Sequence, residues 1–274
     1  MHSKTVLAQT AATFQVQRPN LHDFISRSPI FTAASVPLYS FDTLGNLEII
    51  LKLVEKADAI DFFVNNGIRT ILDAAGANGD ISFIFSLSGF QTTYVDMTLP
   101  WAAGPLVASL SNLRVGANVR VVDFDLDRHF QYSDLTANTV NAGQFKHQDY
   151  GTIFDLVVCT GFLYHLKNPF AFLESLSKLC RFCILGTWCM SHLPDNVTKV
   201  RDAPVAYLLD AERANDGSNY WIFTHTAYNR LVTTAGFVNL ASVNEFLRDD
   251  RISNATDLDY WEKETFLLKS AHNP

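Results

Sequence analysis

The strongest constraint in this sequence is an alternation of short apolar runs with helix-like segments, which begins near residue 69. Seven runs have the length and composition of strands: Arg69–Ala74, Gln91–Val95, Val119–Asp123, Ile153–Cys159, Phe182–Thr187, Val238–Val243 and Thr265–Lys269. Helices are predicted between them at Gly79–Ser88, Leu106–Leu113, Asn168–Leu179 and Thr224–Gly236. Repeated strand-helix units fold into a mostly parallel sheet with helices on both faces. The chain is therefore predicted to be an α/β protein.

Residues 1–60 do not share this alternation. Pro19, Pro29 and Pro37 interrupt residues 1–40, for which the sequence predicts short pieces of structure and loop. A helix is predicted from about residue 43, followed by a short helical stretch near residues 58–65. We therefore divide the chain into an N-terminal helical or irregular cap, residues 1–60, and a main domain, residues 61–274. Within that domain, residues 191–220 break the alternation and are predicted to form a lid-like insertion.

The overall charge limits the choice of partner. Lys and Arg number 21 and Asp and Glu number 28, which gives a net charge of -7. Binding a long nucleic acid usually requires a basic face, so this balance disfavours RNA and favours a small-molecule substrate. No run reaches the roughly 18 apolar residues of a membrane span, and no secretory signal is recognised. The expected location is the cytoplasm, without membrane attachment.

The cysteines and histidines do not predict a metal site. The four cysteines, Cys159, Cys180, Cys183 and Cys189, all lie in apolar segments. Buried, reduced thiols are expected there. The C-x-x-C pair at 180 and 183 lacks a second ligand pair at zinc-finger spacing. Histidines such as His129 and His225 show no ligand spacing either.

Small and acidic residues follow the first three predicted strands. Small residues fill the turn from Asp73 to Gly79, which lets a ligand approach the backbone and the start of the next helix. Asp96 ends the second strand, where a carboxylate can accept both hydroxyls of a ribose. After the third strand, Asp123 can accept from an adenine amino group and Phe124 can cover a ring face. In parallel sheets ligands bind beyond the carboxyl ends of the strands, so these residues together favour a nucleoside ligand.

A fourth segment, Phe154–Pro169, completes an ordered set of motifs. It contains Leu163-Tyr164-His165-Leu166 followed by Asn168-Pro169. With these four segments the chain resembles the class I S-adenosylmethionine-dependent methyltransferases over roughly residues 60–270. Three later stretches, Leu208-Leu209-Asp210, Asn219-Tyr220-Trp221 and Ala235-Gly236-Phe237, are similar to a narrower group. That group contains the bacterial enzymes that methylate or carboxymethylate the wobble uridine of transfer RNA, and relatives of unassigned substrate.

The resemblance implies a fold, a cofactor and a set of binding residues. The fold is a Rossmann-like seven-stranded sheet of order 3-2-1-4-5-7-6 with strand 7 antiparallel, and the cofactor is S-adenosyl-L-methionine. The implied cofactor-binding residues are Asp73, Ala75, Gly76 and Gly79 for the methionine part, Asp96 for the ribose, Asp123 and Phe124 for the adenine, and Thr160 and Gly161 near the methyl group. Met97 is a further implied cofactor-binding residue.

The turn after the first strand departs from the family pattern. That pattern usually reads D-x-G-x-G-x-G, whereas here Ala75 and Ala77 stand at the first two glycine positions and an extra glycine occupies position 76. Gly79 is the glycine that remains in register. Each alanine adds one methyl group, which either shifts the backbone slightly or narrows the pocket.

Catalysis of methyl transfer depends chiefly on holding the acceptor atom in line with the sulfonium methyl group. A hydroxyl or carbon acceptor also needs a base, and His165 is the main candidate, because the pKa of an unperturbed imidazole suits proton transfer near neutral pH. Tyr164 is a second candidate. His165 can equally serve only to orient its loop. In the insertion, Arg201, Tyr220 and Trp221 are candidates for substrate contact, beside the alternative that they pack or face solvent.

Three functions remain open from the sequence. The first is a methyltransferase that acts on a small molecule. The second is an enzyme that modifies the wobble uridine of transfer RNA. The third is a nucleotide-binding module without catalysis, or a nicotinamide-dependent oxidoreductase, although Ala74 breaks the G-x-G-x-x-G order of the latter.

Overall fold

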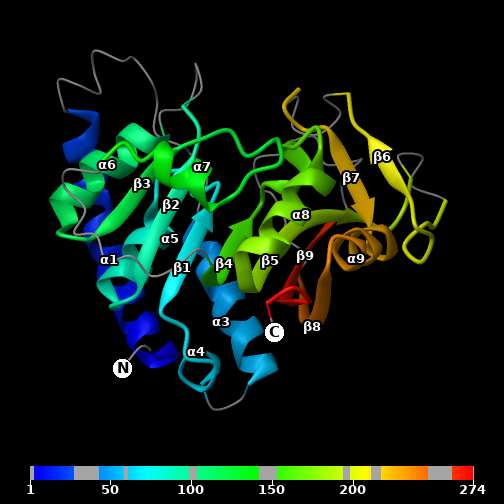
Figure 1. Cartoon of the computed structure of the whole chain (residues 1–274), viewed down its shortest axis with the longest axis horizontal. Coiled ribbons are helices and arrows are strands. Elements are labelled where there is room, and N and C mark those ends of the chain that lie inside the picture. The colour runs from blue at the N-terminus through cyan, green and yellow to red at the C-terminus, as the bar shows by residue number, and fades with distance from the viewer. Residues whose placement is uncertain are drawn as a thin grey trace.

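The computed structural model describes residues 3–27, 43–58, 61–98, 104–141, 153–193, 198–210, 217–245 and 261–273. Its described strands join into one sheet flanked by helices (Figure 1). The strands are β1 (Thr70–Ala74), β2 (Gln91–Asp96), β3 (Val119–Asp123), β4 (Phe154–Thr160), β5 (Cys180–Met190), β6 (Ala206–Leu208), β7 (Trp221–Thr224), β8 (Phe237–Glu245) and β9 (Trp261–Ser270).

The strand order agrees with the predicted α/β fold. Strands β3, β2, β1, β4 and β5 are parallel neighbours in that order. Strand β9 pairs antiparallel with β5, and β8 pairs antiparallel with β9. The seven predicted strands therefore follow the order 3-2-1-4-5-7-6, with the last strand of the chain antiparallel. The sequence does not predict β6 and β7, which extend the sheet beyond the end of β4.

The described helices are α1 (Lys4–Ser26), α3 (Gly45–Ala57), α4 (Phe62–Asn65), α5 (Asp80–Leu87), α6 (Gly104–Val115), α7 (Tyr132–Ala137), η1 (Leu163–His165), α8 (Pro169–Leu179) and α9 (His225–Thr234). Two of them, α8 and α9, begin at polar N-cap residues. The side chain of Asn168 accepts from the N–H of Ala171, and Thr224 accepts from that of Ala227. These caps confirm the predicted starts of α8 and α9.

The prediction of short pieces and loop for residues 1–40 is wrong over residues 4–26, which form the long helix α1. Its buried residues are Leu7, Phe14, Leu21 and Ile25. They form a stripe one residue wide, narrower than the usual apolar face of a surface helix. Pro19 lies inside the helix, so tertiary packing overrides its low helix propensity. Residues 28–42 lie outside the described part.

The two faces of the sheet bury separate apolar cores. On one face, Ile71, Val121 and Ile184 pack with residues of α1, α3, α5 and α6. On the other face, Leu72 and Cys183 pack with residues of α7, α8 and α9. Because side chains alternate along a strand, neighbouring residues supply opposite cores. All four cysteines are free and buried, as predicted.

Helix α1 is also held by a buried ion pair. The guanidinium of Arg18 lies 2.8 Å from the carboxylate of Asp80, which begins α5 and is 1% exposed. The hydroxyl of Thr43 donates to the same carboxylate oxygen at 2.7 Å. The N-terminal residues thus contact the helix that follows β1, and they share the core of the sheet.

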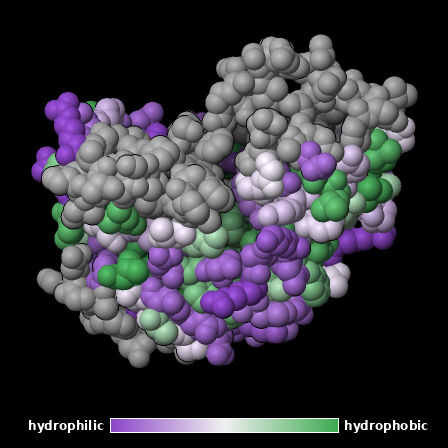
Figure 2. Space-filling view, turned by 90° about the horizontal axis from the view of Figure 1, so that it is seen from above, coloured by the Kyte–Doolittle hydropathy of each residue, from purple (hydrophilic) through white to green (hydrophobic). Residues whose placement is uncertain are grey.

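The described surface is mixed in character. Seen from above, a broad hydrophilic area occupies the lower centre of the view, with hydrophobic residues in smaller groups around it (Figure 2). Among the described helices, none combines the length and the apolar composition needed to cross a membrane.

Candidate active site

The carboxyl ends of the parallel strands bring the predicted residues to one edge of the sheet. Asp96 and Asp123 are register partners on β2 and β3. Asp73, near the end of β1, is the register partner of Val158 on β4. The loops that follow β1 to β4 therefore begin side by side, as expected for a ligand site in this class of sheet.

The turn after β1 adopts left-handed backbone at the two positions where alanine replaces a glycine of the family pattern. Ala75 has φ 58° and Ala77 has φ 51°. Gly79, with φ 85°, caps the start of α5. Left-handed backbone costs roughly 1–2 kcal/mol for a residue with a Cβ atom. The two alanines therefore keep the conformation that glycine favours, at some expense in stability.

Gly76 is required for a different reason, which is space. A Cβ atom at this position would lie 2.6 Å from the Tyr94 ring and 2.8 Å from the Asp73 carboxylate. The extra glycine in the turn therefore makes room for Tyr94, a fully buried side chain of β2.

Strand β2 holds the strained turn in place. The N–H of Ala75 donates to the carbonyl of Val95 at 2.7 Å, and that of Ala77 donates to the Asp96 carboxylate at 2.8 Å. The hydroxyl of Tyr94 donates to the carbonyl of Ala77 at 2.7 Å. These bonds fix the backbone on both sides of each left-handed residue, which is how such strain persists in a fold.

Two carboxylates at this edge, those of Asp73 and Asp96, have raised pKa values. Burial raises the pKa of Asp73 to about 7, although the Ser82 hydroxyl donates to it at 2.6 Å. Burial also raises the pKa of Asp96 to about 6, against the stabilising N–H groups of Met97 and Ala77. Among the described residues, the carboxylates of Asp73 and Asp96 therefore form no ion pair with Lys or Arg.

The end of β3 is more strongly engaged by the fold. The carboxylate of Asp123 accepts from the N–H and the hydroxyl of Thr98, at 2.9 and 2.7 Å. The ring of Phe124 is 5% exposed, with Phe130 at a centroid distance of 5.9 Å and the Arg128 guanidinium 4.4 Å from its centroid. Phe124 therefore presents only a small edge of its ring to any ligand.

The end of β4 is uncrowded as far as the described residues show. Gly161 has φ 88°, and its N–H donates to the carbonyl of Gly186 at 2.9 Å. Of the described residues outside its chain neighbours, a Cβ atom there would meet only the Tyr164 hydroxyl within contact range, at 3.5 Å. Thr160, which precedes Gly161, is partly buried. The described part of the chain thus leaves space above Gly161 and places the Tyr164 hydroxyl beside it.

His165 is fixed by the segment that precedes β7. Its Nδ1 lies 3.0 Å from the carbonyl oxygen of Ser218 and 3.2 Å from the Ser218 hydroxyl. Because a carbonyl only accepts, Nδ1 carries the proton in that bond. In the neutral ring Nε2 is then the basic nitrogen. The ring of Tyr164 lies beside it, at a centroid distance of 4.3 Å.

Two of the predicted substrate residues lie next to this loop. The N–H of Tyr220 donates to the carbonyl of Tyr164 at 2.8 Å, and the Lys167 ammonium lies 5.7 Å from the Tyr220 ring centroid. Trp221 stacks with Phe223 at 6.5 Å, and its buried indole Nε1 has no hydrogen-bond partner in the described structure. The insertion and the loop after β4 therefore meet at these residues.

Arg201, the third predicted substrate residue, contacts a different part of the molecule. Its Nη1 lies 2.7 Å from each carboxylate oxygen of Glu262 on β9. Among the described residues, no hydrogen bond or ring contact joins Arg201 to Tyr220. Its guanidinium is already neutralised by Glu262, which leaves less charge for an anionic substrate.

Sequence reasoning missed several residues that shape the site. Tyr94 and Ser82 hold the turn and Asp73, and Ser218 orients His165. Gly104, at the start of α6, packs against Tyr94, because a Cβ atom there would lie 2.5 Å from the Tyr94 hydroxyl. The one sequence signal for Tyr94 was Gly76, the extra glycine of the turn. A glycine beyond the family pattern indicates that a large side chain approaches the backbone closely.

Comparison with solved structures supports the assignment of the fold. The N-terminal domain of EvdMO1 with SAH bound has a TM-score of 0.53 at 15% identity, over 87% of this chain and 93% of that chain. The same domain in the presence of SAH and D-fucose has a TM-score of 0.51 at 15% identity, over 79% and 82%. The PH0226 protein from Pyrococcus horikoshii OT3 has a TM-score of 0.52 at 12% identity, over 90% and 98%.

The sequence itself matches no functionally curated protein. It does match the family model described as "Methyltransferase domain" over residues 49–242, which is more than half of the chain. That range includes β1 to β5 and every residue discussed at the carboxyl edge of the sheet. The chain therefore belongs to the methyltransferase domain family.

Proposed function

We propose that this chain transfers the methyl group of S-adenosylmethionine to a small-molecule acceptor. The observation that carries the proposal is the contact between the turn Asp73–Gly79 and the Asp96 carboxylate at the carboxyl edge of the sheet. A turn of small residues admits a nucleoside close to the backbone, and a carboxylate accepts ribose hydroxyls. The binding of SAH by the N-terminal domain of EvdMO1, which has this fold, agrees with the proposal.

The residues present fit such a cofactor. A carboxylate offers about four acceptor positions, and backbone N–H groups take two of those on Asp96. Among the described residues, only the Tyr164 hydroxyl would contact a side chain at Gly161. A cation near Asp73 and Asp96 also favours their ionised forms, so the acidic edge suits a positively charged sulfonium.

We assign the binding roles accordingly. Asp73, Ala75, Gly76 and Gly79 hold the methionine part, Asp96 and Met97 hold the ribose, Asp123 and the edge of Phe124 flank the adenine, and Thr160 and Gly161 lie next to the methyl group.

The chemistry of the chain itself is positioning and proton removal. When bound, S-adenosylmethionine supplies an electrophilic methyl group. The protein has to align the acceptor with that group and keep water out, which can contribute roughly 7–11 kcal/mol to lowering the barrier. His165 takes the acceptor proton at Nε2, because Ser218 holds the proton on Nδ1. Tyr164 orients the acceptor from the space beside Gly161.

In this proposal residues 191–220 form a lid over the main domain, residues 61–274. Residues 1–60 form the N-terminal cap. Tyr220 and Trp221 supply the wall nearest to His165, through the bond between Tyr220 and Tyr164. Arg201 fastens the insertion to β9 through Glu262. It therefore anchors the lid and leaves the acceptor to the other two residues.

Modification of the transfer RNA wobble uridine is the second candidate. Its support is the similarity of residues 208–210, 219–221 and 235–237 to that group. The net charge of -7 opposes it, so we favour a small acceptor.

Calorimetric titration with S-adenosylhomocysteine and with NAD tests the proposal directly. We expect one equivalent of S-adenosylhomocysteine to bind and NAD to give no heat. Asp96→Ala should weaken binding about 10–100-fold, because a charge-assisted hydrogen bond contributes roughly 1.5–3 kcal/mol. Asp125→Ala, an exposed aspartate beyond β3, should bind as the wild type does.

Two results would contradict the proposal. One is tighter binding of NAD than of S-adenosylhomocysteine. The other is unchanged affinity in Asp96→Ala, provided that the variant keeps the wild-type circular dichroism. Titration with transfer RNA at about 150 mM salt separates the two acceptors, and saturable binding there would favour the nucleic acid substrate.

A further inference from the structure

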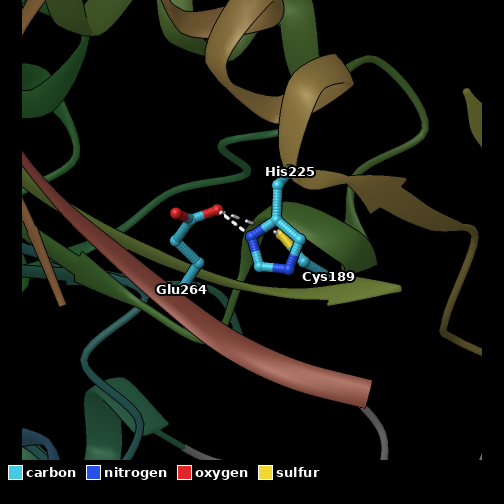
Figure 3. A group of neighbouring side chains, drawn as sticks. All are labelled: Cys189, His225 and Glu264. Carbon is cyan, nitrogen blue, oxygen red and sulfur yellow. Dashed lines mark hydrogen bonds and ion pairs between the residues drawn. The ribbon is translucent and has the colours of Figure 1, made fainter. Parts of the chain in front are cut away.

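Three side chains with metal-ligating atoms converge on one face of the sheet, from β5, α9 and β9 (Figure 3). The Nδ1 atom of His225 lies 2.5 Å from Oε2 of Glu264, and Sγ of Cys189 lies 3.9 Å from the same oxygen. The three ligand atoms all lie within 4.8 Å of one another. None of these residues belongs to the proposed methyl-transfer site.

We propose that Cys189, His225 and Glu264 form a binding site for a zinc-class transition-metal dication. A thiolate, an imidazole and a carboxylate are all ligands that Zn²⁺ accepts. The sulfur ligand argues against Mg²⁺ and Ca²⁺, which bind oxygen. Three protein ligands leave one of four tetrahedral positions for water.

The distances permit this geometry after a small adjustment. With Zn–S near 2.3 Å and Zn–N and Zn–O near 2.0–2.2 Å, tetrahedral ligand atoms stand about 3.3–3.6 Å apart. The observed separation between sulfur and oxygen is 3.9 Å, close to that range. The separation between Nδ1 and Oε2 is 2.5 Å, that of a hydrogen bond. The metal would replace the proton of that bond and push Nδ1 and Oε2 apart by about 0.8–1.1 Å.

The other side of the imidazole carries a second, independent sign of a metal site. Oε2 of Glu262 lies 3.2 Å from Nε2 of His225, which is buried and makes no hydrogen bond of good geometry in the described structure. Arg201 and the side-chain amide of Asn244 hold the Glu262 carboxylate in turn. Histidine ligands usually donate their remaining N–H to such a carboxylate. A small rotation of the imidazole would let Nε2–H donate to Glu262, which would then orient His225 without binding the metal.

The burial and charge of the cluster fit a dication. The side chains of His225 and Glu264 are 10% and 12% exposed, and Cys189 is fully buried. The carboxylates of Glu262 and Glu264 face the imidazole of His225, and Arg201 is a nearby cation. Burial raises the pKa of the Cys189 thiol well above its ordinary value, so the metal would have to displace a proton from sulfur.

Metal binding to the full chain tests this proposal without reference to methyl transfer. The protein is freed of metal with a chelator, and Zn²⁺ or Co²⁺ is added under reducing conditions. We expect one equivalent of Zn²⁺ to remain after dialysis, and Co²⁺ to give a thiolate charge-transfer band. Cys189→Ala should abolish that band. Cys183→Ala, which removes a matched buried thiol of the same strand, should retain both the band and the zinc.

Two further variants keep the test decisive if Cys189→Ala folds poorly. Glu264→Gln should lose most of the zinc affinity, and Glu262→Gln should weaken it about 10–100-fold through the orientation of His225. A protein that retains no zinc overturns the proposal, as does a cobalt spectrum without the thiolate band. In either of those cases His225 and Glu264 form only a buried hydrogen-bonded pair. Failure here leaves the methyl-transfer proposal untouched, because the readout is metal content.

Discussion

Buried carboxylates have opposite pKa shifts in the turn after β1 and in the cluster around Glu262. Burial raises the pKa of Asp73 to about 7, and its hydrogen bonds come from the uncharged hydroxyl and backbone N–H of Ser82. Burial also acts to raise the pKa of Glu262, but Asn244, Arg201 and His225 together bring it below its ordinary value. The side chain of Glu262 is 4% exposed, so partners rather than burial decide the sign. Among the described residues, Asp73 has no cationic partner, whereas Glu262 is already paired with Arg201.

The largest test of this comparison is the pH dependence of Asp73→Asn. The pKa of Asp73 is raised in the folded state, so from pH 5 to pH 8 the unfolded chain has already lost a proton that the native state keeps until about pH 7. Wild-type stability therefore falls with rising pH over that window, by about 2–3 kcal/mol from this group. Asp73→Asn removes this titrating group. The free energy of unfolding of the variant relative to wild type, measured with urea, should therefore rise by about 2–3 kcal/mol from pH 5 to pH 8.

Asp125→Asn serves as the control for that experiment, because its side chain is exposed. Its stability relative to wild type should not change between pH 5 and pH 8. A gain in both variants, or in neither, would show that Asp73 ionises normally and that the two regions do not differ.

Glu262→Gln probes the other side of the comparison. The pKa of Glu262 is lowered in the folded state, so its contribution is present above about pH 4.5 and is lost as pH falls through the folded value. At pH 7 the variant should be less stable by about 1–2 kcal/mol, a figure reduced because the Arg201 side chain is 43% exposed. The deficit should shrink below pH 4 in thermal unfolding.

Glu245→Gln is the matched control, because Glu245 pairs with the exposed Lys52 at 2.8 Å. Its effect should be smaller than that of Glu262→Gln at pH 7, because solvent screens an exposed ion pair. Equal losses in the two variants would mean that burial adds nothing to the Glu262 pair.

The smallest predicted effect concerns the strain in the turn. Ala75→Gly should raise stability by about 0.5–1 kcal/mol, since relief of the left-handed backbone exceeds the extra entropy of the unfolded chain. Ala74→Gly, on the neighbouring β1 position, should lower stability by about 0.5–1 kcal/mol. Urea unfolding at one pH measures both. A loss in Ala75→Gly would mean that the turn is not strained.

The first of these regions could largely be predicted from the sequence, because its residues lie close together along the chain. Apolar runs placed β1 to β4, and their ends placed Asp73, Asp96 and Asp123. What the sequence could not predict was the use of each side chain. The engagement of Asp123 by Thr98 and the burial of the Phe124 ring depend on tertiary packing.

The second region was not predicted, because its residues come from distant elements. Cys189, His225 and Glu264 lie on β5, α9 and β9, with no spacing that marks them as a set. Helix α1 was missed for a related reason. Its narrow apolar stripe is meaningful only against the core that buries it, and Pro19 argued locally against a helix.

The placement of β9 has a consequence for the order of folding. Strand β9 follows β8 along the chain, yet in the sheet it lies between β5 and β8. Among the described strands β8 pairs with β9 alone, so β8 can join the sheet only together with β9. The earlier strands can assemble before β9 is synthesised. Closure of the sheet, and assembly of the carboxylates of Glu262 and Glu264 with the rest of their cluster, must await the docking of β9.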